Sequence, residues 1–511
     1  MTIAVSVSHA DTLISSMKMR SPDVAVIGGG PAGATAARLL AEWGHSVVVL
    51  SRPAGPRPPL AESVPPSTRR VLAAVGALGL VEGAGFLPTA GNTSWWGTEE
   101  PRVERFPGEP GWQVLREDLE ALLLRAADTS GVDVRTGVRV RRVRLESGDD
   151  PRLEVETEAR VTEGLVARHV LDASGRTGVV ACQGFRRRHG PTTLALSAVF
   201  RREGGFAVPD DTHTLVESFP EGWAFSIPVA SGLRHATVMI DPPRRQSRPR
   251  DLPALYLREL GKARRLGSLL EGAERLTPAW ATDASTYTAR EFAGEHYALV
   301  GDASSFLDPL SSFGVKKALA SGWLAAVATH TALRNPSRAG MAAGFFSRRE
   351  GQVHARYARE AARHAAEAAA RHAGSAFWRA RAEGPADLPD EDDEPLATDG
   401  AIGQAFEALK AHPRLRLRLG SGVRIAPAPA VVGREIAMAD ALVGTDGRPV
   451  HFVDGVSAAI LARLAPHAEQ AGDLCEAYNR AAPEVAVGSF LHGLSTLLAA
   501  GLLRDEATPR R

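Results

Sequence analysis

The feature that most restricts how this chain can fold is a glycine-rich turn in the run DVAVIGGGPAGATAARLLAEWGHSVVVLSR. A buried strand is predicted at 24–27, an alanine-rich helix follows the turn, and a second apolar strand is predicted at 46–50. The spacing Gly28-x-Gly30-x-x-Gly33 permits a tight turn, close approach of the backbone to a pyrophosphate, and close packing of helix on strand. The sequence therefore predicts a βαβ unit that binds a dinucleotide at the helix N-terminus.

The position after the second strand departs from the usual pattern for such units. An acidic residue commonly binds a ribose there, but this chain has Ser51 followed by Arg52. Either Ser51 makes a weaker hydroxyl contact, or the ribose is held differently. Both residues are candidate cofactor-binding residues.

A second informative stretch is ALVGDASSFLDPLSSFGVKKALASG, residues 298–322. Asp302 follows an apolar strand, and a carboxylate at a strand end can accept hydrogen bonds from a sugar-like hydroxyl. Gly314 stands at the start of a predicted helix, where backbone amides can face an electron-rich group. The stretch favours a site for the ribityl chain and ring of a flavin, although a purely structural βα turn has the same pattern.

The chain between these two stretches contributes further candidates. Arg116 lies near the start of an amphipathic helix, from which it can reach a phosphate or a ribityl group. Glu62 is either a solvated or capping carboxylate or part of a strap between cofactor and substrate. Short alternating strands are predicted over 132–170 and again over about 192–287. We expect the second group to form a sheet over the flavin, as a substrate domain inserted in the chain.

Composition excludes several classes of protein. A length of 511 residues with 44% hydrophobic and 23% charged residues predicts two or three globular domains. A net charge of +1 indicates neither a nucleic-acid partner nor a membrane-surface protein. The two cysteines, Cys182 and Cys475, exclude a disulfide framework and suit the cytoplasm. Residues 1–20 are expected to be a disordered leader, and no membrane span is predicted.

No metal site is predicted from the histidine spacing. His354, His364 and His372 fall in a segment rich in alanine, arginine and glutamate, which is typical of an exposed helix. We therefore expect these three side chains to be solvated.

Four motifs occur in a defined order: GGGPAG, the helix that begins near Arg116, LDASGR and VGDA…DP. With these motifs, residues from about 23 to 383 resemble the superfamily of flavin-dependent halogenases and aromatic hydroxylases, which has the fold of the p-hydroxybenzoate hydroxylases. The resemblance implies FAD as cofactor. It places Gly28, Gly30 and Gly33 at the pyrophosphate, Arg116 at a phosphate, Asp302 at the ribityl chain, and Pro309, Gly314 and Val315 at the isoalloxazine edge.

Within this superfamily, single residues separate the branches. Halogenases need a lysine near the position of GNTSWWG, and this chain has no lysine between Met19 and Gly261. Their WxWxIP motif appears here as WAFSIP, with Phe225 in place of the second tryptophan. Beside the flavin, where tryptophan halogenases have a Glu-Ser-Thr-Gly-like run, this chain has Ser311, Ser312, Phe313 and Gly314. The resemblance thus disfavours halogenation, with Phe313 expected to fill the halide pocket and Glu62, Ser312 and Phe313 as candidate catalytic residues.

The runs AESVPPSTRRVL, GNTSWWG, DPLSSFGVKKALASG and SAFWRARAE resemble the hydroxylase-like branch that modifies tryptophan in tryptophylquinone biogenesis. This implies an FAD-dependent monooxygenase in which a flavin C4a-hydroperoxide, formed with molecular oxygen, hydroxylates an aromatic ring, such as tryptophan in a peptide or protein. Electrons would come from NAD(P)H or a partner flavin reductase. Three alternatives stay open: hydroxylation of a free or carrier-bound small aromatic, halogenation, and a non-catalytic flavin-binding or peptide-binding protein.

The last part of the chain has a different composition. Residues 384–400 are acidic and contain proline, which predicts a linker. Residues 401–511 are then a separate domain, with a β-hairpin at 434–452 and three helices at 455–464, 471–481 and 485–502. This order resembles the winged-helix-like peptide-binding domains of the PqqD type and so implies a peptide or protein partner.

The charge of this last domain argues against nucleic acid. Residues 431–505 hold five arginines and nine carboxylates, the wrong sign for binding phosphate. A purely structural role, in dimerisation or capping, stays open. The overall prediction is an α/β chain: a Rossmann-like FAD-binding domain with an inserted mixed β-sheet substrate domain, followed by a small α+β winged-helix-like domain.

Overall fold

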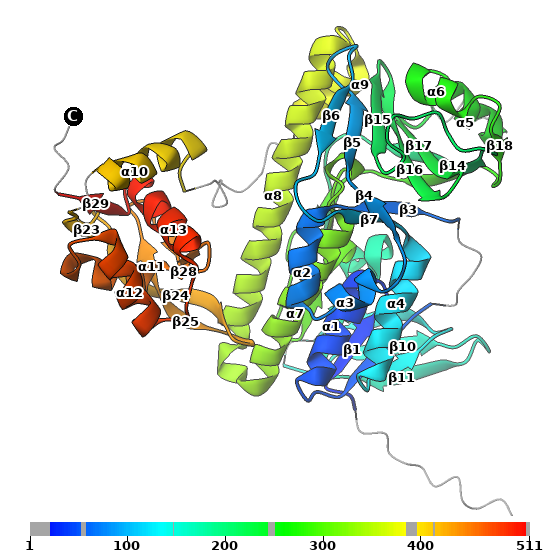
Figure 1. The fold of residues 1–511 in the computed structure, drawn as a ribbon. Coiled ribbons are helices and arrows are strands. Elements are labelled where there is room, and N and C mark those ends of the chain that lie inside the picture. The colour runs from blue at the N-terminus through cyan, green and yellow to red at the C-terminus, as the bar shows by residue number, and fades with distance from the viewer. Residues whose placement is uncertain are drawn as a thin grey trace, which may run out of the picture.

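The chain contains both helices and sheets, as predicted for an α/β protein (Figure 1). The computed structural model describes residues 21–52, 58–146, 148–243, 251–384, 396–411 and 414–506. The leader predicted at 1–20 and most of the predicted linker lie outside the described residues. No helix in these described ranges is both long enough and apolar enough to cross a membrane.

A parallel five-stranded sheet forms the centre of the first part, with strand order β21-β12-β1-β2-β8. Strands β1, β2, β12 and β21 are buried and consist mostly of apolar residues, whereas the edge strand β8 is partly exposed. Helix α1 connects β1 to β2 and packs against α7. The bounds of these elements are β1 (Val24–Ile27), α1 (Pro31–Glu42), β2 (Val47–Leu50), β8 (Asp133–Arg135), β12 (His169–Asp172), β21 (Tyr297–Leu299) and α7 (Gly314–Arg334).

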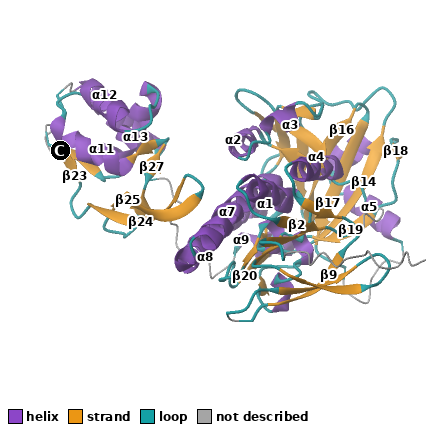
Figure 2. Ribbon diagram, turned by 90° about the horizontal axis from the view of Figure 1, so that it is seen from below, coloured by secondary structure: helices purple, strands orange, loops and turns teal. Residues whose placement is uncertain are grey.

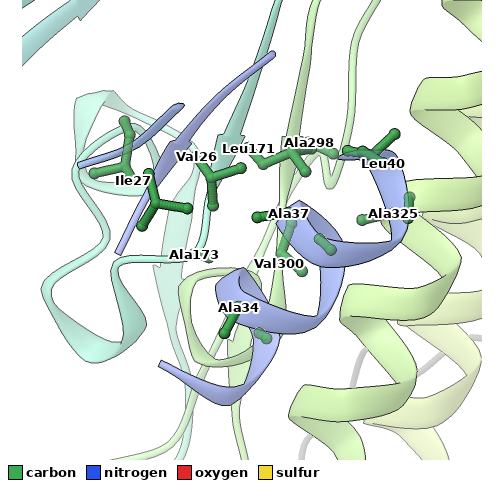
Figure 3. Packing of buried hydrophobic residues seen from close by; sticks show 14 of the residues in the cluster. Val26, Ile27, Ala34, Ala37, Leu40, Leu171, Ala173, Ala298, Val300 and Ala325 are labelled. Atoms are coloured by element: carbon green, nitrogen blue, oxygen red, sulfur yellow. The ribbon is translucent and has the colours of Figure 1, made fainter. Parts of the chain in front are cut away.

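Small side chains allow the helices to lie close to this sheet. Val26, Leu171 and Ala298 come from three adjacent strands, and Ala34 and Ala37 of α1 lie over them (Figure 3). Farther along α7, a Cβ atom built on its glycine at position 322 would lie 2.4 Å from the backbone oxygen of residue 32 in α1. The contact between α1 and α7 therefore depends on a residue without a side chain.

A mixed eight-stranded sheet forms the second part, and its long strands fall within the predicted range 192–287. Two strands from farther upstream, β5 and β6, extend it; β5 pairs with β15 in parallel, and the remaining pairs are antiparallel. Helices α5 (Leu252–Leu260) and α6 (Arg264–Leu270) pack on it. Its strands are β5 (Gly91–Trp95), β6 (Arg102–Arg105), β14 (Leu194–Arg201), β15 (Thr214–Phe219), β16 (Gly222–Ala230), β17 (Leu233–Ile240), β18 (Glu274–Arg275) and β19 (Trp280–Asp283).

Three smaller antiparallel sheets complete this region. One contains β3, β7 and β4, and α4 begins directly after β7. The second is the predicted meander of β9, β10 and β11, and the third consists of β13 (Arg186–Arg188), β20 (Tyr287–Ala289) and β22 (Ser305–Phe306). The bounds are β3 (Ala61–Val64), β4 (Leu87–Thr89), β7 (Gly111–Leu115), α4 (Arg116–Thr129), β9 (Arg139–Arg144), β10 (Arg152–Glu156) and β11 (Thr162–Val166).

The long helix α8 (Ala339–Arg371) runs beside α7 and on to α9 (Ala376–Ala382) (Figure 1). The prediction that its histidines are solvated is wrong for His354, which is 4% exposed. Its Nε2 atom lies 3.0 Å from Nε2 of His189, and burial lowers the pKa of His354 to about 3. The buried residues of α8 are mostly alanines, together with Phe346, Glu350 and His354. The composition of the whole segment therefore did not reveal its buried face.

The third part has its own apolar core, which includes Leu417, Leu461 and Phe490. Its helices α11, α12 and α13 lie on one side of a long hairpin (Figure 2). Strand β25 pairs briefly with β26 across the predicted turn, but its main partner is β24, a strand that sequence reasoning missed. The elements are α10 (Asp399–Ala411), β23 (Leu417–Leu419), β24 (Arg424–Val432), β25 (Glu435–Val443), β26 (Pro449–Val450), β27 (Phe452–Val453), β28 (Val456–Ser457), α11 (Ala458–Leu464), α12 (Ala471–Ala481), α13 (Val487–Ala499) and β29 (Leu503–Asp505).

The tip of the β24–β25 hairpin docks on the first part of the molecule. Ile436 is completely buried in the apolar core of the first part, and its backbone N–H donates to Oγ1 of Thr331 in α7 at 2.8 Å. Beside it, Arg338 and Glu435 form an ion pair with an N–O distance of 3.3 Å. The third part is therefore attached by packing as well as by the chain that leads into it.

We expect Ile436→Ala to lower the free energy of unfolding by about 3 kcal/mol, because it removes a fully buried side chain from a packed interface. Thermal or urea unfolding measures the change. Met438→Ala is the matched control: Met438 lies two residues along the same strand, is 54% exposed and should cost little. Equal losses in both variants would contradict this view of the interface.

Candidate functional site

One continuous cavity connects the parallel sheet with the mixed sheet. At one end it is lined by the turn before α1, and at the other by the inner face of the mixed sheet. The residues of the first end include Gly30, Ala32, Glu62, Arg116, Gly175, Arg176 and Asp302. The loop before α7 and the sheet supply Phe306, Asp308, Pro309, Ser312, Gly314, Val315 and Lys317, together with Ala195, Ser197, Thr214, Trp223, Phe225, Ile227, Thr237 and Met239.

Two helices begin at this cavity. The N-cap residues are Gly30 for α1 and Phe313 for α7; neither makes a side-chain capping bond, and neither helix has an acidic residue in its first turn. The first backbone N–H groups of a helix have no partner within the helix, and the dipole adds positive potential there. Both helix ends thus suit negatively charged or electron-rich groups, as the pyrophosphate and the pyrimidine edge of FAD are.

The turn before α1 can only be built with glycine at two places. Gly28 has φ +105°, and a Cβ atom there would lie 2.4 Å from the backbone oxygen of Ala173. A Cβ atom on Gly33 would lie 2.0 Å from the backbone oxygen of Gly28. These two glycines shape the turn, whereas Gly30 itself lines the cavity.

Arg116 is surrounded by carboxylates. Its Nε donates to Glu120 Oε1 at 2.8 Å, and one terminal nitrogen lies 3.5 Å from Glu62 Oε1. Burial alone would lower the pKa of Arg116, but the nearby charges of Glu62, Asp302 and Glu120 raise it. Arg116 therefore keeps its positive charge. Burial raises the pKa of the Glu62 carboxyl, and Arg116 opposes that shift. The structure thus brings Glu62, Arg116 and Asp302 together.

Asp302 lies in the turn that follows β21, with Gly301 before it at φ +64°. A buried lysine holds this turn: Lys317 Nζ donates to the backbone oxygen of Gly301 at 3.0 Å and to that of Ser305. Nζ also lies 3.9 Å from Asp302 Oδ1. Sequence reasoning asked only for a lysine near GNTSWWG and so assigned no role to Lys317, which lines the cavity.

The loop before α7 differs in one respect from expectation. Pro309, Gly314 and Val315 line the cavity, as does Ser312, whose φ of 52° is rare for a residue with a side chain. Phe313 does not occur among the described residues that line it. Its ring packs against Tyr357 of α8, with ring centroids 4.8 Å apart. A role of Phe313 in filling a halide pocket stays a prediction.

Ser51 and Arg52 also lie apart from the described cavity lining. The backbone N–H of Ser51 donates to Arg135, and its backbone oxygen accepts from Val138, both at 2.9 Å. These bonds join the end of β2 to the turn after β8. A contact of either residue with a ribose stays a prediction.

The floor of the cavity combines aromatic rings with hydroxyl groups. Ser197 of β14 and Thr237 of β17 are paired residues whose hydroxyl oxygens lie 2.8 Å apart. Trp223 and Phe225 come from β16, with ring centroids 5.4 Å apart. Sequence reasoning placed this sheet at the flavin but missed the two hydroxyls, because their pairing depends on the register of β14 with β17.

A second cavity lies behind the segment 306–310. It shares Trp223, Phe306, Leu307, Asp308 and Leu310 with the first cavity, so these residues separate the two. Burial raises the pKa of the Asp308 carboxyl, against a bond from the backbone N–H of Leu310. The far wall is formed by residues of α8 and α9 and by the His189 loop, namely His189, His354, Ala358, Ala361, Ala362, Ala365 and Trp378.

Comparisons with known proteins agree with this geometry. The model of the FAD binding domain family matches residues 21–331. A tryptophan 2-halogenase of Chondromyces crocatus is 28% identical over 338 residues, which are 64% of this chain and 65% of that protein, slightly less than two thirds. The flavin-dependent halogenase armH1 of Armillaria mellea is 29% identical over 366 residues, 66% of this chain and 70% of that protein.

Solved structures are similar over more of the chain. CmlS, a flavin-dependent halogenase, has a TM-score of 0.76 at 22% identity; the superposition covers 95% of this chain and 96% of the CmlS chain. The peptidyl tryptophan dihydroxylase QhpG, essential for tryptophylquinone cofactor biogenesis, has a TM-score of 0.66 at 24% identity and covers 94% of this chain and 100% of its own. At these identities both structures establish the fold alone.

Proposed function

Because this chain belongs to the FAD binding domain family, we propose that it is an FAD-dependent monooxygenase that hydroxylates an aromatic ring at the floor of its cavity. The observation that carries the proposal is the continuity of that cavity. It begins at two uncapped helix N-termini, which suit the charged parts of FAD, and it ends at a floor of aromatic rings and hydroxyls. Such a floor fits a planar ring with one polar group.

Residues at different positions along the cavity have different roles in binding and in the reaction. The N-terminus of α1 and Arg116 bind phosphate oxygens, and Asp302 accepts a hydrogen bond from a ribityl hydroxyl. Reduced FAD, when bound, activates molecular oxygen for reaction with an electron-rich ring. The N-terminus of α7 stabilises negative charge at the edge of the cofactor, and Trp223 and Phe225 exclude water from the reacting groups.

Orientation of the ring and transfer of its proton fall to other side chains. The Ser197–Thr237 pair can bind an N–H or O–H group of the substrate from below. A carboxyl group with a raised pKa suits the acceptance and return of a proton. We assign this role to Asp308, which lines both cavities, because Glu62 lies against Arg116 and so belongs to the cofactor end.

Halogenation is the second candidate, and the names of the relatives favour it. A halogenase of this superfamily is expected to need a lysine that can carry or steer the oxidised halide. Among the described residues that line the cavity, the one lysine is Lys317. Its ammonium group already donates to two backbone oxygens and lies near Asp302. This arrangement supports hydroxylation over halogenation.

The substrate that we propose is a tryptophan side chain in a peptide or protein. Support comes from the docked third part, whose Met438 and Phe452 are 54% and 60% exposed. The similarity to QhpG extends over this part, because it covers 94% of the chain. A free or carrier-bound small aromatic is the competing substrate class.

Mass spectrometry tests the reaction and the substrate together. The enzyme is supplied with FAD, a flavin reductase, NADH, ¹⁸O₂ and bromide, and is offered free tryptophan or tryptophan-containing peptides encoded beside its gene. We expect a gain of ¹⁸O in a peptide. A bromine isotope pattern would establish halogenation instead, and oxidation of free tryptophan alone would exclude peptide recruitment. A protein that cannot be reconstituted with FAD would overturn the whole proposal.

A further inference from the structure

Buried charged groups on α7 and α8 hold the turn that carries Asp302. Lys317 of α7 is 4% exposed and donates to the backbone oxygens of Gly301 and Ser305. Glu350 of α8 is 3% exposed, and its Oε2 accepts a hydrogen bond from Ser304 Oγ at 2.7 Å. Both ends of the short turn from 301 to 305 are therefore fixed by side chains from outside it.

A serine on α7 adds a further connection. Ser321 Oγ accepts a hydrogen bond from the backbone N–H of Gly301 at 2.8 Å, and its hydroxyl also bonds to Glu350. Ser321 and Lys317 are four residues apart, so they lie on the same face of α7. The turn, α7 and α8 thus share one buried polar network around Gly301.

A single buried charge in such a network would be very unfavourable, because transfer out of water costs several kcal/mol per ion. Burial lowers the pKa of Lys317, and the charges of Asp302 and then Glu350 oppose that shift. Burial raises the pKa of Glu350, and the charge of Lys317 opposes that shift, so the two buried groups partly compensate each other. Their positions differ in one respect that matters. Lys317 lines the cavity, whereas Glu350 does not occur among the described lining residues.

We propose that Lys317 is a positioning residue for the cofactor and that Glu350 is its buried counter-charge. The proposal rests on the FAD site of the proposed function. Lys317 lies one helical turn after Gly314, so it stands between the N-terminus of α7 and Asp302. It fixes the carboxylate that receives the ribityl chain, and it holds a positive charge behind the flavin end of the cavity.

This arrangement has consequences of opposite sign for the two residues. A nearby cation stabilises the anionic reduced form of a flavin more than the neutral oxidised form, so it raises the reduction potential. Loss of Lys317 should therefore make the potential of bound FAD more negative. Loss of the negative charge of Glu350 leaves Lys317 less screened and should make the potential more positive. A general loss of structure cannot produce both shifts.

The test uses Lys317→Met, Glu350→Gln and the double variant in the full chain. Lys316→Met is the matched control, because Lys316 directly precedes Lys317 on α7 but is only partly buried and does not occur among the described lining residues. Its Nζ bonds to Ser67 Oγ and lies 5.0 Å from the centroid of the Phe313 ring. The dissociation constant of FAD is measured by quenching of flavin fluorescence, the midpoint potential by equilibration with reference dyes, and stability by thermal unfolding. None of these measurements requires turnover.

We expect Lys317→Met to weaken FAD binding at least tenfold, to lower the midpoint potential and to lower Tm. Glu350→Gln should raise the midpoint potential. The double variant should regain much of the lost Tm, because both of the deeply buried charges are then absent, while its potential stays below that of the unchanged protein. Lys316→Met should resemble the unchanged protein in all three measurements.

Two results would overturn the inference: a double variant whose FAD potential equals that of the unchanged protein, or a Glu350→Gln variant whose potential falls. If Lys317→Met does not fold, the double variant and Glu350→Gln still decide the question. Failure of the unchanged protein to bind FAD would instead contradict the proposed function. If the protein hydroxylates its substrate but the midpoint potential of bound FAD is the same in all three variants as in the unchanged protein, the proposed function stands and this inference is wrong.

Discussion

Arg116→Leu lowers the affinity for FAD by at least a hundredfold, about 2.7 kcal/mol, if the cavity binds the cofactor as proposed. The change leaves Glu62, Glu120 and Asp302 facing one another without the cation that balances them. A bound pyrophosphate would then add two negative charges to three carboxylates. Titration of the apoprotein with FAD, followed by flavin fluorescence, measures the loss.

Two further variants separate charge from structure. Arg116→Lys keeps the positive charge but loses the planar fork that binds two oxygens at once, so an intermediate affinity is expected. Arg125→Leu changes an exposed arginine on the same helix and should leave the affinity unchanged. An Arg116→Leu variant that binds FAD within threefold of the unchanged protein would exclude Arg116 from the cofactor site.

Gly33→Ala is expected to abolish FAD binding and to lower the free energy of unfolding by about 3 kcal/mol or more. The added methyl group would lie 2.0 Å from the backbone oxygen of Gly28 and 3.1 Å from Cβ of Ala173. Neither neighbour is a flexible side chain, so α1 must move away from the turn and from the sheet. Thermal unfolding and flavin fluorescence report the two effects separately.

A second glycine-to-alanine change provides the control. Gly340 lies in α8, and a Cβ atom there would meet nothing within 4 Å. Gly340 is the second residue of α8, so Gly340→Ala should change stability little and leave FAD binding unchanged. If both alanine variants unfold at the temperature of the unchanged protein, the turn at Gly33 has room for a methyl group and this prediction is wrong.

The parts of the fold that were predictable have local signals. Gly28, Gly30 and Gly33 sit at fixed spacing between a strand and a helix, and the structure contains that βαβ unit with its parallel sheet. Arg116 begins a helix, and Asp302 follows a strand, as their surroundings indicated. These signals depend on neighbours within a few residues, which a single sequence displays.

The residues that were missed depend on contacts between distant segments. Lys317 reads as a surface cation in the run GVKKALASG, and only the packing of α7 on the 301–305 turn buries it. His354 belongs to a charged helix, but it meets His189 from a loop 165 residues away. Asp308 acquires its raised pKa through burial between two cavities. No periodicity within a short window records such partners.

Strand β24 was missed for a different reason, because prolines argue against a central strand. Pro427 and Pro429 pair with Asp440 and Met438 of β25 at alternate positions, so their missing N–H groups face away from β25. The ladder between β24 and β25 therefore loses no bond. The same two prolines remove donors from the outer edge of β24, which makes that edge a poor place for a peptide to add as a strand.

Helix α7 is one uninterrupted rod of 21 residues, about 30 Å long, with different tasks at its two ends. Its first residues face the cofactor cavity, and Thr331 near its last turn holds the hairpin tip at Ile436. A partner that binds the hairpin and shifts its position therefore acts on α7, the same helix that borders the flavin. By thermodynamic reciprocity, whatever factor such a partner contributes to FAD affinity, FAD contributes to the affinity for the partner. The coupling between the two sites is therefore one constant. It can be determined either from the affinity for FAD with and without the partner or from the affinity for the partner with and without FAD.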